Sequence, residues 1–260
     1  MDLDLRDRVF LVTGGSAGLG LAGARALTAE GARVVIAARD TEQVEQAVAE
    51  FEPGSAIGLQ ADLAEPSVAA RLTEAAKAHF GRIDGSLVSV GGPPPGTALG
   101  VDDRSWTDAF QSVFLGPLRV ARAIAGALPA NAASPVGTTG SVLLVLSTSA
   151  FSPIPDLAIS NGLRPGLAML TKQLADELGP RGIRVNAIAP GRFATERVRS
   201  LDASRGDPHL VRQQFESAIP LGRYGEPDEF GALAAFILSP RASYLTGTVV
   251  TLDGGASRQP

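Results

Sequence analysis

Short apolar runs alternate with longer segments of helical period along almost the whole chain. The runs are apolar nearly throughout rather than at every second residue, which is typical of parallel strands covered on both faces. Strands are predicted at Val9–Thr13, Val34–Ala37, Ala56–Gln60, Gly85–Val90, Ser141–Leu146, Arg184–Ile188 and Thr248–Leu252. Helices are predicted at Gly18–Glu30, Glu42–Phe51, Pro66–Phe80, Ser105–Leu128, Pro165–Leu178 and Pro227–Leu238. The pattern predicts a doubly wound α/β fold, with a parallel sheet and helices on both faces.

Composition narrows the functions that such a chain can have. With 45% hydrophobic and 19% charged residues, the chain can bury a large core, and a single domain over residues 1–260 is expected. A net charge of -4 without a basic run argues against nucleic acid and membrane partners. The absence of cysteine excludes disulfides and thiolate sites. The N-terminus has neither the pattern of a signal peptide nor that of a membrane span, so a cytoplasmic protein is expected.

The first predicted strand leads directly into a glycine-rich turn, and a helical pattern begins at once. The turn reads Thr13-Gly14-Gly15-Ser16-Ala17-Gly18-Leu19-Gly20. Glycines there permit a tight turn and a close approach of the backbone to a pyrophosphate, while the helix N-terminus supplies N–H donors. A purely structural turn is the alternative, but the strand, turn and helix context favours a nucleotide site.

The order of motifs resembles that of the short-chain dehydrogenase/reductase family over essentially the whole chain, and in particular its 3-oxoacyl-(acyl carrier protein) reductase-like members. The resemblance rests on the glycine turn and on Asp62-Leu63, Arg184 to Gly191, Leu245-Thr246-Gly247 and Leu252-Asp253-Gly254-Gly255. It implies a Rossmann-like domain that transfers hydride between a nicotinamide cofactor and a small carbonyl or alcohol substrate. The cofactor contacts that it implies are Thr13, Gly14, Ser16, Gly18, Leu19, Gly20, Asp62, Leu63, Gly91, Arg164, Pro190, Gly191 and Thr195.

The end of the second predicted strand bears on the choice of cofactor. It reads Ala38-Arg39-Asp40. An arginine can grip the extra phosphate of NADP(H), whereas enzymes for NAD(H) usually place an acidic residue there to bind the free ribose hydroxyl. NADP(H) is therefore favoured, with Arg39 as its ligand. NAD(H) stays open, because Arg39 and Asp40 can equally form a solvated helix-capping pair, and Ala17 is not the second basic residue that many NADP-binding members carry.

The resemblance also implies a catalytic set from which this chain departs. Members of the family use a tyrosine as proton donor, a lysine four residues later that holds the ribose, a serine that positions the carbonyl, and an asparagine in a water-linked relay. The matching positions hold Ser160, Arg164, Ser147 and Val113, respectively. A serine hydroxyl has a far higher pKa than a phenol, so proton transfer is expected to receive less assistance. The proton would come from Ser160, from solvent or from an acidic substrate.

Other segments near this set carry expectations of their own. Neither Tyr224 nor Tyr244 is expected to replace the missing tyrosine, because both lie in ordinary family segments. Pro165 is expected to start the active-site helix or to kink it, since proline lacks an N–H and disfavours helical dihedrals in the preceding residue. Residues 196–219 are charged and irregular, and form a candidate substrate lid. The loop from Gly92 to Gly96 is either a stiff wall beside the nicotinamide or a plain surface loop, and Asn131–Gly140 is expected to be a surface loop.

These observations leave three functions open. The leading hypothesis is an NADP(H)-preferring oxidoreductase with an atypical active site, in which Ser147 orients the substrate and Arg164 holds the ribose. The alternatives are an NADP-binding sensor or regulatory protein without turnover, and a non-redox enzyme on the same scaffold. No metal is expected, because His79 and His209 lack partners at ligand spacing. The resemblance and the apolar Ala109–Leu128 segment imply a homodimer or homotetramer.

Overall fold

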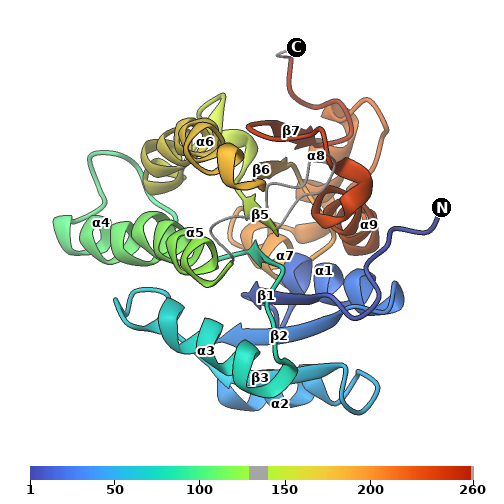
Figure 1. Cartoon of the computed structure of the whole chain (residues 1–260). Coiled ribbons are helices and arrows are strands. Elements are labelled where there is room, and N and C mark those ends of the chain that lie inside the picture. The colour runs from blue at the N-terminus through green and yellow to red at the C-terminus, as the bar shows by residue number, and fades with distance from the viewer. Residues whose placement is uncertain (129–139, 259–260) are drawn as a thin grey trace.

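Seven strands form one parallel sheet in the order β3-β2-β1-β4-β5-β6-β7, as Figure 1 shows from bottom to top. The computed structural model describes residues 1–128 and 140–258. The strands are β1 (Val9–Thr13), β2 (Arg33–Ala38), β3 (Ala56–Gln60), β4 (Gly85–Val88), β5 (Gly140–Val145), β6 (Ile183–Pro190) and β7 (Val249–Leu252). The chain winds outward from β1 to β3, returns to β4 beside β1, and continues to β7. This confirms the predicted doubly wound, Rossmann-like α/β fold.

Helices cover both faces of the sheet. The α-helices are α1 (Gly18–Ala29), α2 (Thr41–Val48), α3 (Val68–Phe80), α4 (Asp103–Ala109), α5 (Gly116–Ala127), α6 (Ala158–Leu178), α7 (Glu196–Ala203), α8 (Pro208–Ala218) and α9 (Pro227–Leu238). The shorter elements are a π-helical turn, η1 (Phe110–Leu115), and the 3₁₀ turns η2 (Thr148–Ala150), η3 (Gly179–Arg181) and η4 (Pro240–Ala242). Apolar side chains of α3, α5 and α6 pack on one face of the sheet, and those of α1, α2 and α9 on the other (Figure 1).

The inner strands are buried along their whole length. Every residue of β1, β4, β5 and β6 is buried, and these runs are apolar or small except for Arg184 and Asn186 of β6, whose side chains donate to backbone carbonyls. Leu72, Ile124 and Leu174 fill the core on one face, and Leu27 and Phe230 on the other. Each large apolar side chain buried in this way contributes about 1.5–3 kcal/mol before the opposing chain entropy. The two cores hold the carboxyl edge of the sheet in place, and the site is built on that edge.

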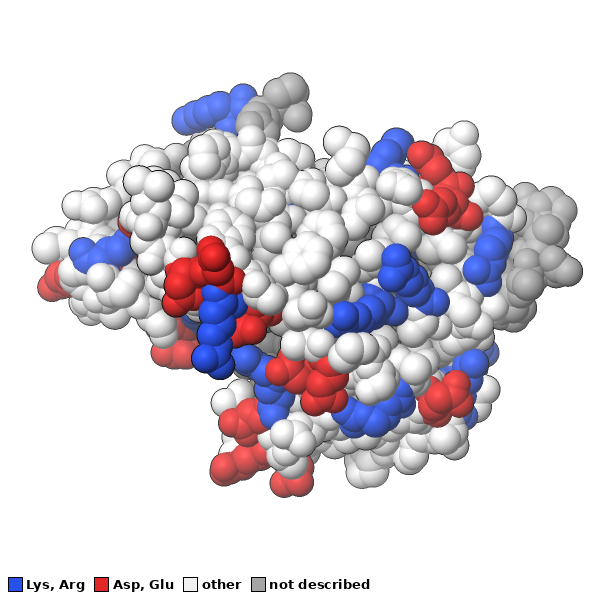
Figure 2. Space-filling view, turned by 90° about the vertical axis from the view of Figure 1, so that its left-hand side faces the viewer, with Lys and Arg blue, Asp and Glu red and all other residues white. Residues whose placement is uncertain are grey.

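The helix predicted from Ser105 to Leu128 is divided into α4, η1 and α5. Pro117 explains the division, because it has no N–H to donate to the carbonyl of Val113 and its ring crowds that carbonyl. A π-helical turn widens the helix at this point and relieves the crowding. The side of the molecule formed by α4, η1, α5 and α6 exposes apolar side chains, among them Phe110 and Met169. Figure 2 shows few charged side chains over the upper half of this side.

The helix that carries Ser160, α6, begins at Ala158 and contains Pro165, so of the two expected effects of this proline the helix start is wrong. Hydrogen bonds to the preceding loop hold the first turn of α6 in place. The side-chain amide of Asn161 accepts a hydrogen bond from the Ile154 N–H (3.0 Å) and donates one to the Ile154 carbonyl (2.9 Å). With the preceding loop held in this way, Pro165 removes only one backbone hydrogen bond from a helix that its buried face keeps packed on the sheet.

The candidate lid, residues 196–219, is more regular than predicted, because it contains the helices α7 and α8. Each helix begins with an N-cap residue whose side chain accepts a hydrogen bond from the backbone of the first turn. Thr195 accepts from the N–H of Val198, and Asp207 accepts from the N–H of His209 (2.8 Å). The expectation of an irregular segment is therefore wrong, although its place beyond the end of β6 is as expected.

One expectation lies largely beyond what the structure describes. The loop predicted at Asn131–Gly140 is outside the described residues except for Gly140, which begins β5. Within the described ranges, no helix combines the length and the apolar character that a bilayer crossing requires.

Candidate active site

The glycine turn after β1 has the tight backbone that the sequence predicts. Gly14 and Gly18 have φ angles of 56° and 54°, in the left-handed region where glycine is favoured. A Cβ atom placed on Gly20 would lie 2.1 Å from the carbonyl oxygen of Gly14, so only glycine fits there. Ser16 and Leu19, the other residues predicted from this turn, are half-buried.

The N-terminus of α1 presents its first N–H groups without a side-chain cap. Its N-cap residue is Ala17, and the first turn holds no acidic residue. The turn is tied to the end of β4, because the Thr13 hydroxyl donates to the carbonyl of Ser89 (2.7 Å). Free donors and the positive end of a helix dipole are what a pyrophosphate needs, and the residues present fit this part of a dinucleotide.

The segment after β6 reaches the same turn. Pro190 is the last residue of β6, and the N–H of Gly191 donates to the carbonyl of Leu252 on β7 (2.9 Å). A Cβ atom on Gly18 would lie 3.6 Å from Cγ2 of Thr195, which is 9% exposed. The structure thus brings Thr195 to the glycine turn, although the two are far apart in the sequence.

Arg39 follows β2 and has no ion-pair partner among the described residues. Its side chain is exposed, and its Nη2 lies 4.0 Å from a Cβ atom placed on Gly91, after β4. The neighbouring Asp40 does not pair with it. Asp40 instead caps α2 by accepting from the N–H of Gln43 (3.0 Å). The guanidinium of Arg39 is therefore available to a ligand at this edge of the sheet.

Asp62 and Leu63, the pair that the resemblance implies as cofactor contacts, follow the end of β3. The Asp62 carboxylate accepts from the N–H of Ala64 (2.9 Å), and Leu63 is buried. A Cβ atom on Gly116 would lie 2.7 Å from Cβ of Leu63, so α5 packs directly against this corner.

Arg164 is a buried cation without an acidic partner in the described part of the chain. Its side chain is 5% exposed, and Nη1 donates to the carbonyl of Val145 at the end of β5 (2.5 Å). Nε is fully buried and has no hydrogen-bond partner. Burial lowers the pKa of Arg164 to about 10. An unpaired guanidinium at this depth is unfavourable for the free protein, and it fits the ribose hydroxyls or another acceptor group of a bound ligand.

Three serine hydroxyls meet where β5 ends and α6 begins. The hydroxyls of Ser149 and Ser160 are 2.8 Å apart, and both residues are buried. The Ser147 oxygen accepts from the N–H of Ser149 (3.1 Å), so its own hydrogen remains free to donate. Ser160 and Arg164 lie one turn apart on the buried side of α6. Ser149 is not among the predicted site residues, although its spacing from Ser147 could have suggested it.

Comparison with known proteins identifies the family. The family model described as Enoyl-(Acyl carrier protein) reductase matches residues 14–257. Dehydrogenase/reductase SDR family member 4 of Homo sapiens is 33% identical over 255 residues, covering 96% of this chain and 88% of the relative. The chain is a short-chain dehydrogenase/reductase. Because its relatives are named oxidoreductases, reductases and dehydrogenases, it is an oxidoreductase of this family that acts on a small molecule.

Two solved structures match this short-chain dehydrogenase/reductase over nearly its whole length. L-sorbose reductase from Gluconobacter frateurii, in complex with NADPH and L-sorbose, has a TM-score of 0.88 at 26% identity and covers 100% of both chains. A short chain oxidoreductase from Pseudomonas aeruginosa PAO1, described as containing an atypical catalytic center, has a TM-score of 0.88 at 27% identity and covers 99% of this chain and 100% of its own.

In this short-chain dehydrogenase/reductase, the position predicted for the relay asparagine is an apolar wall. Val113 is 2% exposed and belongs to a small cluster with Ala109 of α4 and with Ile159 and Leu163 of α6. The cluster packs η1 against the helix that carries Ser160. Val113 therefore supplies packing here, and its side chain has no polar group to offer a water molecule.

In this short-chain dehydrogenase/reductase, a buried carboxylate joins the candidate lid to the segment that follows β6. Asp202 at the end of α7 accepts from the hydroxyl of Tyr224 (2.9 Å) and pairs with Arg192 (2.5 Å). The guanidinium of Arg192 also lies 3.2 Å from the ring centroid of Phe215 on α8. Burial, together with the hydrogen bond to Asp202, raises the pKa of Tyr224 to about 12. Tyr224 thus has an anchoring role, and Tyr244 is fully exposed.

The loop from Gly92 to Gly96 joins the lid to the start of α6. Its buried Pro93 accepts a hydrogen bond from Arg197 of α7 (2.9 Å). Its other end is held by the N–H of Gly96, which donates to the carbonyl of Asp156 (2.7 Å), and by the carbonyl of Gly96, which accepts from the N–H of Ala158 (3.1 Å). These contacts hold the loop between α7 and the start of α6.

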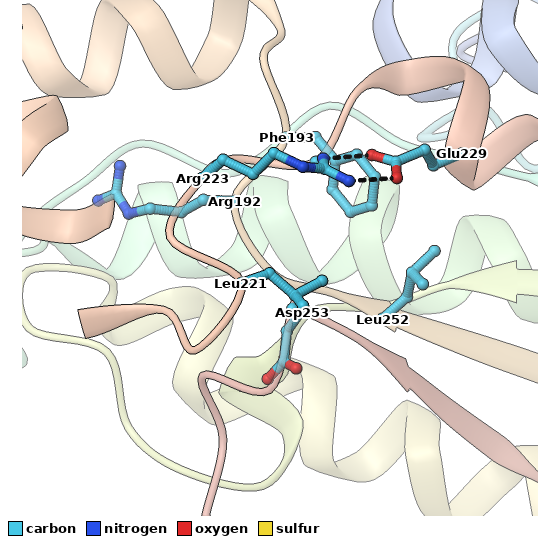
Figure 3. A pocket seen from close by; sticks show the side chains of 9 residues that line it. Arg192, Phe193, Leu221, Arg223, Glu229, Leu252 and Asp253 are labelled. Carbon is cyan, nitrogen blue, oxygen red and sulfur yellow. Dashed lines mark hydrogen bonds and ion pairs between the residues drawn. The ribbon is translucent and has the colours of Figure 1, made fainter. Parts of the chain in front are cut away.

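A small hollow lies beyond β6 and β7, on the other side of the lid anchor (Figure 3). Arg223 and Glu229 lie together along one edge of it and form two hydrogen bonds of 2.7 Å. These bonds lower the pKa of Glu229 to about 2. The carboxylate of Asp253 accepts from the N–H groups of Gly255 and Ser257. Arg192 points away from the hollow in Figure 3, toward Asp202. The charged groups that line it are satisfied by the protein itself.

Proposed function

We propose that this protein is an NADP(H)-preferring oxidoreductase that interconverts a small carbonyl compound and its alcohol without a tyrosine proton donor. The observation that carries the proposal is the buried guanidinium of Arg164, with an unpartnered Nε, at the sheet edge where the glycine turn and the serine hydroxyls converge. Such a group is unfavourable unless a ligand completes it. A bound dinucleotide whose ribose lies beside the reacting centre would do so.

Cofactor choice rests on Arg39. Its guanidinium has no acidic partner in the described structure, while Asp40 is committed to capping α2. A free arginine at the end of β2 suits the 2′-phosphate of NADP(H), which it can bind with two parallel hydrogen bonds. The NADPH bound to the L-sorbose reductase of similar fold supports this choice.

The chemistry divides among four side chains. When bound, the nicotinamide supplies or accepts the hydride at the carbonyl carbon. The Ser147 hydroxyl, whose hydrogen is free, donates to the carbonyl oxygen. Ser160 passes a proton to that oxygen and regains one through the hydroxyl of Ser149, 2.8 Å away, which takes its own proton from solvent. Arg164 holds the ribose and places a positive charge near the developing oxyanion. Without a phenol, we expect turnover to be slower by roughly 10²–10⁴ than a well-matched acid would allow.

The helices α7 and α8 form the lid in this proposal. They follow the end of β6, where a substrate cover is expected in this fold. The pairing of Asp202 with Arg192 and Tyr224 fixes the C-terminal end of α7.

A second candidate is a nucleotide-binding protein that senses redox state without turnover. The observation that favours it is that Ser160 is already satisfied by Ser149, while Val113 fills the relay position with an apolar side chain. The Pseudomonas aeruginosa protein of similar fold supports the first candidate, because it is called an oxidoreductase although its catalytic center is atypical.

We also propose that the protein is a homodimer or homotetramer. The sparsely charged upper half of the side shown in Figure 2, together with the exposed Phe110 of η1 and Met169 of α6, supports an interface there. Sedimentation velocity at micromolar concentration tests this, and a monomer would contradict it.

Nucleotide titration tests the function. NADPH should bind at least about tenfold more tightly than NADH, and Arg39→Ala should remove the difference. Arg33→Ala is the control, because Arg33 lies at the opposite end of β2 from Arg39 and pairs with Asp7. NADPH consumption is then followed with ketones, diketones, quinones and β-ketoacyl thioesters. Turnover that Ser147→Ala and Arg164→Lys reduce supports the oxidoreductase. Binding without turnover on the whole panel favours the sensor, and failure to bind either nucleotide overturns both.

A further inference from the structure

Arg197, the second residue of α7, lies at the cofactor edge of the sheet although no motif marks it. A Cβ atom placed on Gly92 would lie 2.9 Å from its Nη2, 3.1 Å from its Nε and 3.3 Å from its Cζ. The guanidinium therefore covers the backbone of Gly92 closely, and the absence of a side chain there makes the approach possible. Its Nη2 donates to a neutral acceptor, the carbonyl of Pro93 (2.9 Å).

The neighbours of Arg197 place it beside the glycine turn. Thr195, two residues earlier, lies against Gly18 of that turn. The Nη2 of Arg39 lies next to Gly91, the residue before Gly92. Two arginines, one after β2 and one on α7, thus approach two consecutive glycines at the end of β4.

Neither arginine forms an ion pair with a carboxylate within residues 1–128 and 140–258. On α7 itself the contrast is direct, because Arg199 pairs with Glu196 (2.9 Å), whereas Arg197 donates to the Pro93 carbonyl. A phosphate oxygen carries the charge that the Pro93 carbonyl lacks, and a phosphate can accept two parallel hydrogen bonds from one guanidinium. The Pro93 carbonyl is therefore an acceptor that a phosphate can replace.

We propose that Arg197 binds the pyrophosphate of the dinucleotide, exchanging the Pro93 carbonyl for a phosphate oxygen. The inference rests on the proposed nucleotide binding, and adds to it a second arginine with a separate task. Arg39 recognises the 2′-phosphate and so sets the choice between NADP(H) and NAD(H). Arg197 recognises the part that both cofactors share, and draws α7 onto the cofactor when either one binds.

The two arginines should give opposite patterns in a binding experiment. The Arg197→Met variant is titrated with NADPH, with NADH, and with adenosine 2′-monophosphate, which keeps the 2′-phosphate but lacks the pyrophosphate. We expect the Kd for NADPH and the Kd for NADH to rise by the same factor, about 10–100-fold, with adenosine 2′-monophosphate unaffected. Arg39→Ala should weaken NADPH and adenosine 2′-monophosphate and leave NADH unchanged.

Arg199→Met is the matched control, since it removes a cation from the same helix and should leave all three affinities unchanged. Arg197→Lys keeps the charge without the planar fork, and should give an intermediate loss even if the methionine variant does not fold. Unchanged or tighter binding of NADPH by Arg197→Met would overturn the inference, as would a loss confined to NADPH or one shared by adenosine 2′-monophosphate. A wild-type protein that binds neither dinucleotide would instead overturn the proposed function itself.

Discussion

The hydroxyl of Ser160 lies 2.8 Å from the hydroxyl of Ser149, and both side chains are buried. The contact joins the 3₁₀ turn after β5 to the first turn of α6. Either oxygen can donate, so the pair can pass a proton in both directions, which suits a reversible reaction. The same contact is a buried hydrogen bond that holds the two elements together.

Removing one partner of this pair should therefore affect stability. Ser149→Ala leaves the Ser160 hydroxyl without its partner, and we expect the free energy of unfolding to fall by about 1–3 kcal/mol. Ser160→Ala should have a similar effect, and the double variant should lose less than the sum because the interaction can be lost only once. Urea unfolding measures all three. Strictly additive losses would show that the two hydroxyls do not interact in solution.

The two buried arginines should respond to substitution with opposite signs. Burial lowers the pKa of both Arg164 and Arg184 to about 10, at an energetic cost of roughly 3 kcal/mol each at neutral pH. Arg184 recovers this through four hydrogen bonds to carbonyls at the end of α9 and at Leu245. Arg164 donates one, to Val145.

We expect Arg164→Met to raise the free energy of unfolding of the nucleotide-free protein by about 1–3 kcal/mol while weakening NADPH binding. Arg184→Met should lower the free energy of unfolding by at least about 2 kcal/mol. Because both folded-state pKa values are depressed, the unfolded chain holds more protons above pH 10, so each penalty disappears as the pH rises from about 10 to 12.5. Destabilisation by Arg164→Met would show that Arg164 serves the fold rather than a ligand.

The pH dependence of turnover should differ from that of an enzyme with a catalytic tyrosine. Serine hydroxyls do not ionise in the working range, and Tyr224 has a pKa of about 12. We expect kcat to be level between about pH 6 and pH 9 and to fall as Arg164 loses its proton near pH 10. Steady-state rates with saturating NADPH measure this. A break near neutral pH would reveal an ionising donor other than Ser160.

The anchor of the lid can be loosened by removing one oxygen atom. Tyr224→Phe leaves Asp202 with Arg192 but takes away the hydroxyl donor (2.9 Å). We expect faster amide hydrogen exchange in residues 196–219 and a higher KM, with stability lower by about 1–3 kcal/mol. Tyr244→Phe is the control, since Tyr244 is fully exposed. If amide hydrogens of residues 196–219 exchange equally fast in the two variants, the Tyr224–Asp202 contact does not anchor the lid.

The layered fold could be predicted because each of its causes is local. Strands buried on both faces are apolar or small along most of their length, and β1 and β5 show this pattern directly in the sequence. The start of α6 could not be predicted from Pro165, because the residue that fixes its first turn, Asn161, acts through a loop segment seven positions away. The π-helical turn at Phe110–Leu115 does not follow from the apolar pattern either, since Pro117 fits the period of one continuous helix.

In the candidate site, the residues that belong to sequence motifs could be predicted, and the residues that reach the site only through tertiary contacts could not. The glycine turn could be read from its strand, turn and helix context, and the positions of Ser147, Ser160 and Arg164 from the resemblance to the family; the structure places these three near the end of β5. The contact of Arg197 with Pro93 joins segments 104 residues apart and has no motif of its own. Packing decides such contacts, so sequence patterns do not reveal them.

The loop from Gly92 to Gly96 has a consequence for redesign. Gly96 is bonded to Asp156 on one side and to Ala158 on the other, and Ala158 is the first residue of the helix that carries Ser160. A loop transplanted from a relative to change the substrate range would therefore also shift the entrance of that helix. Because the loop is hydrogen-bonded to the start of α6, this loop and the first turn of α6 would have to be exchanged together.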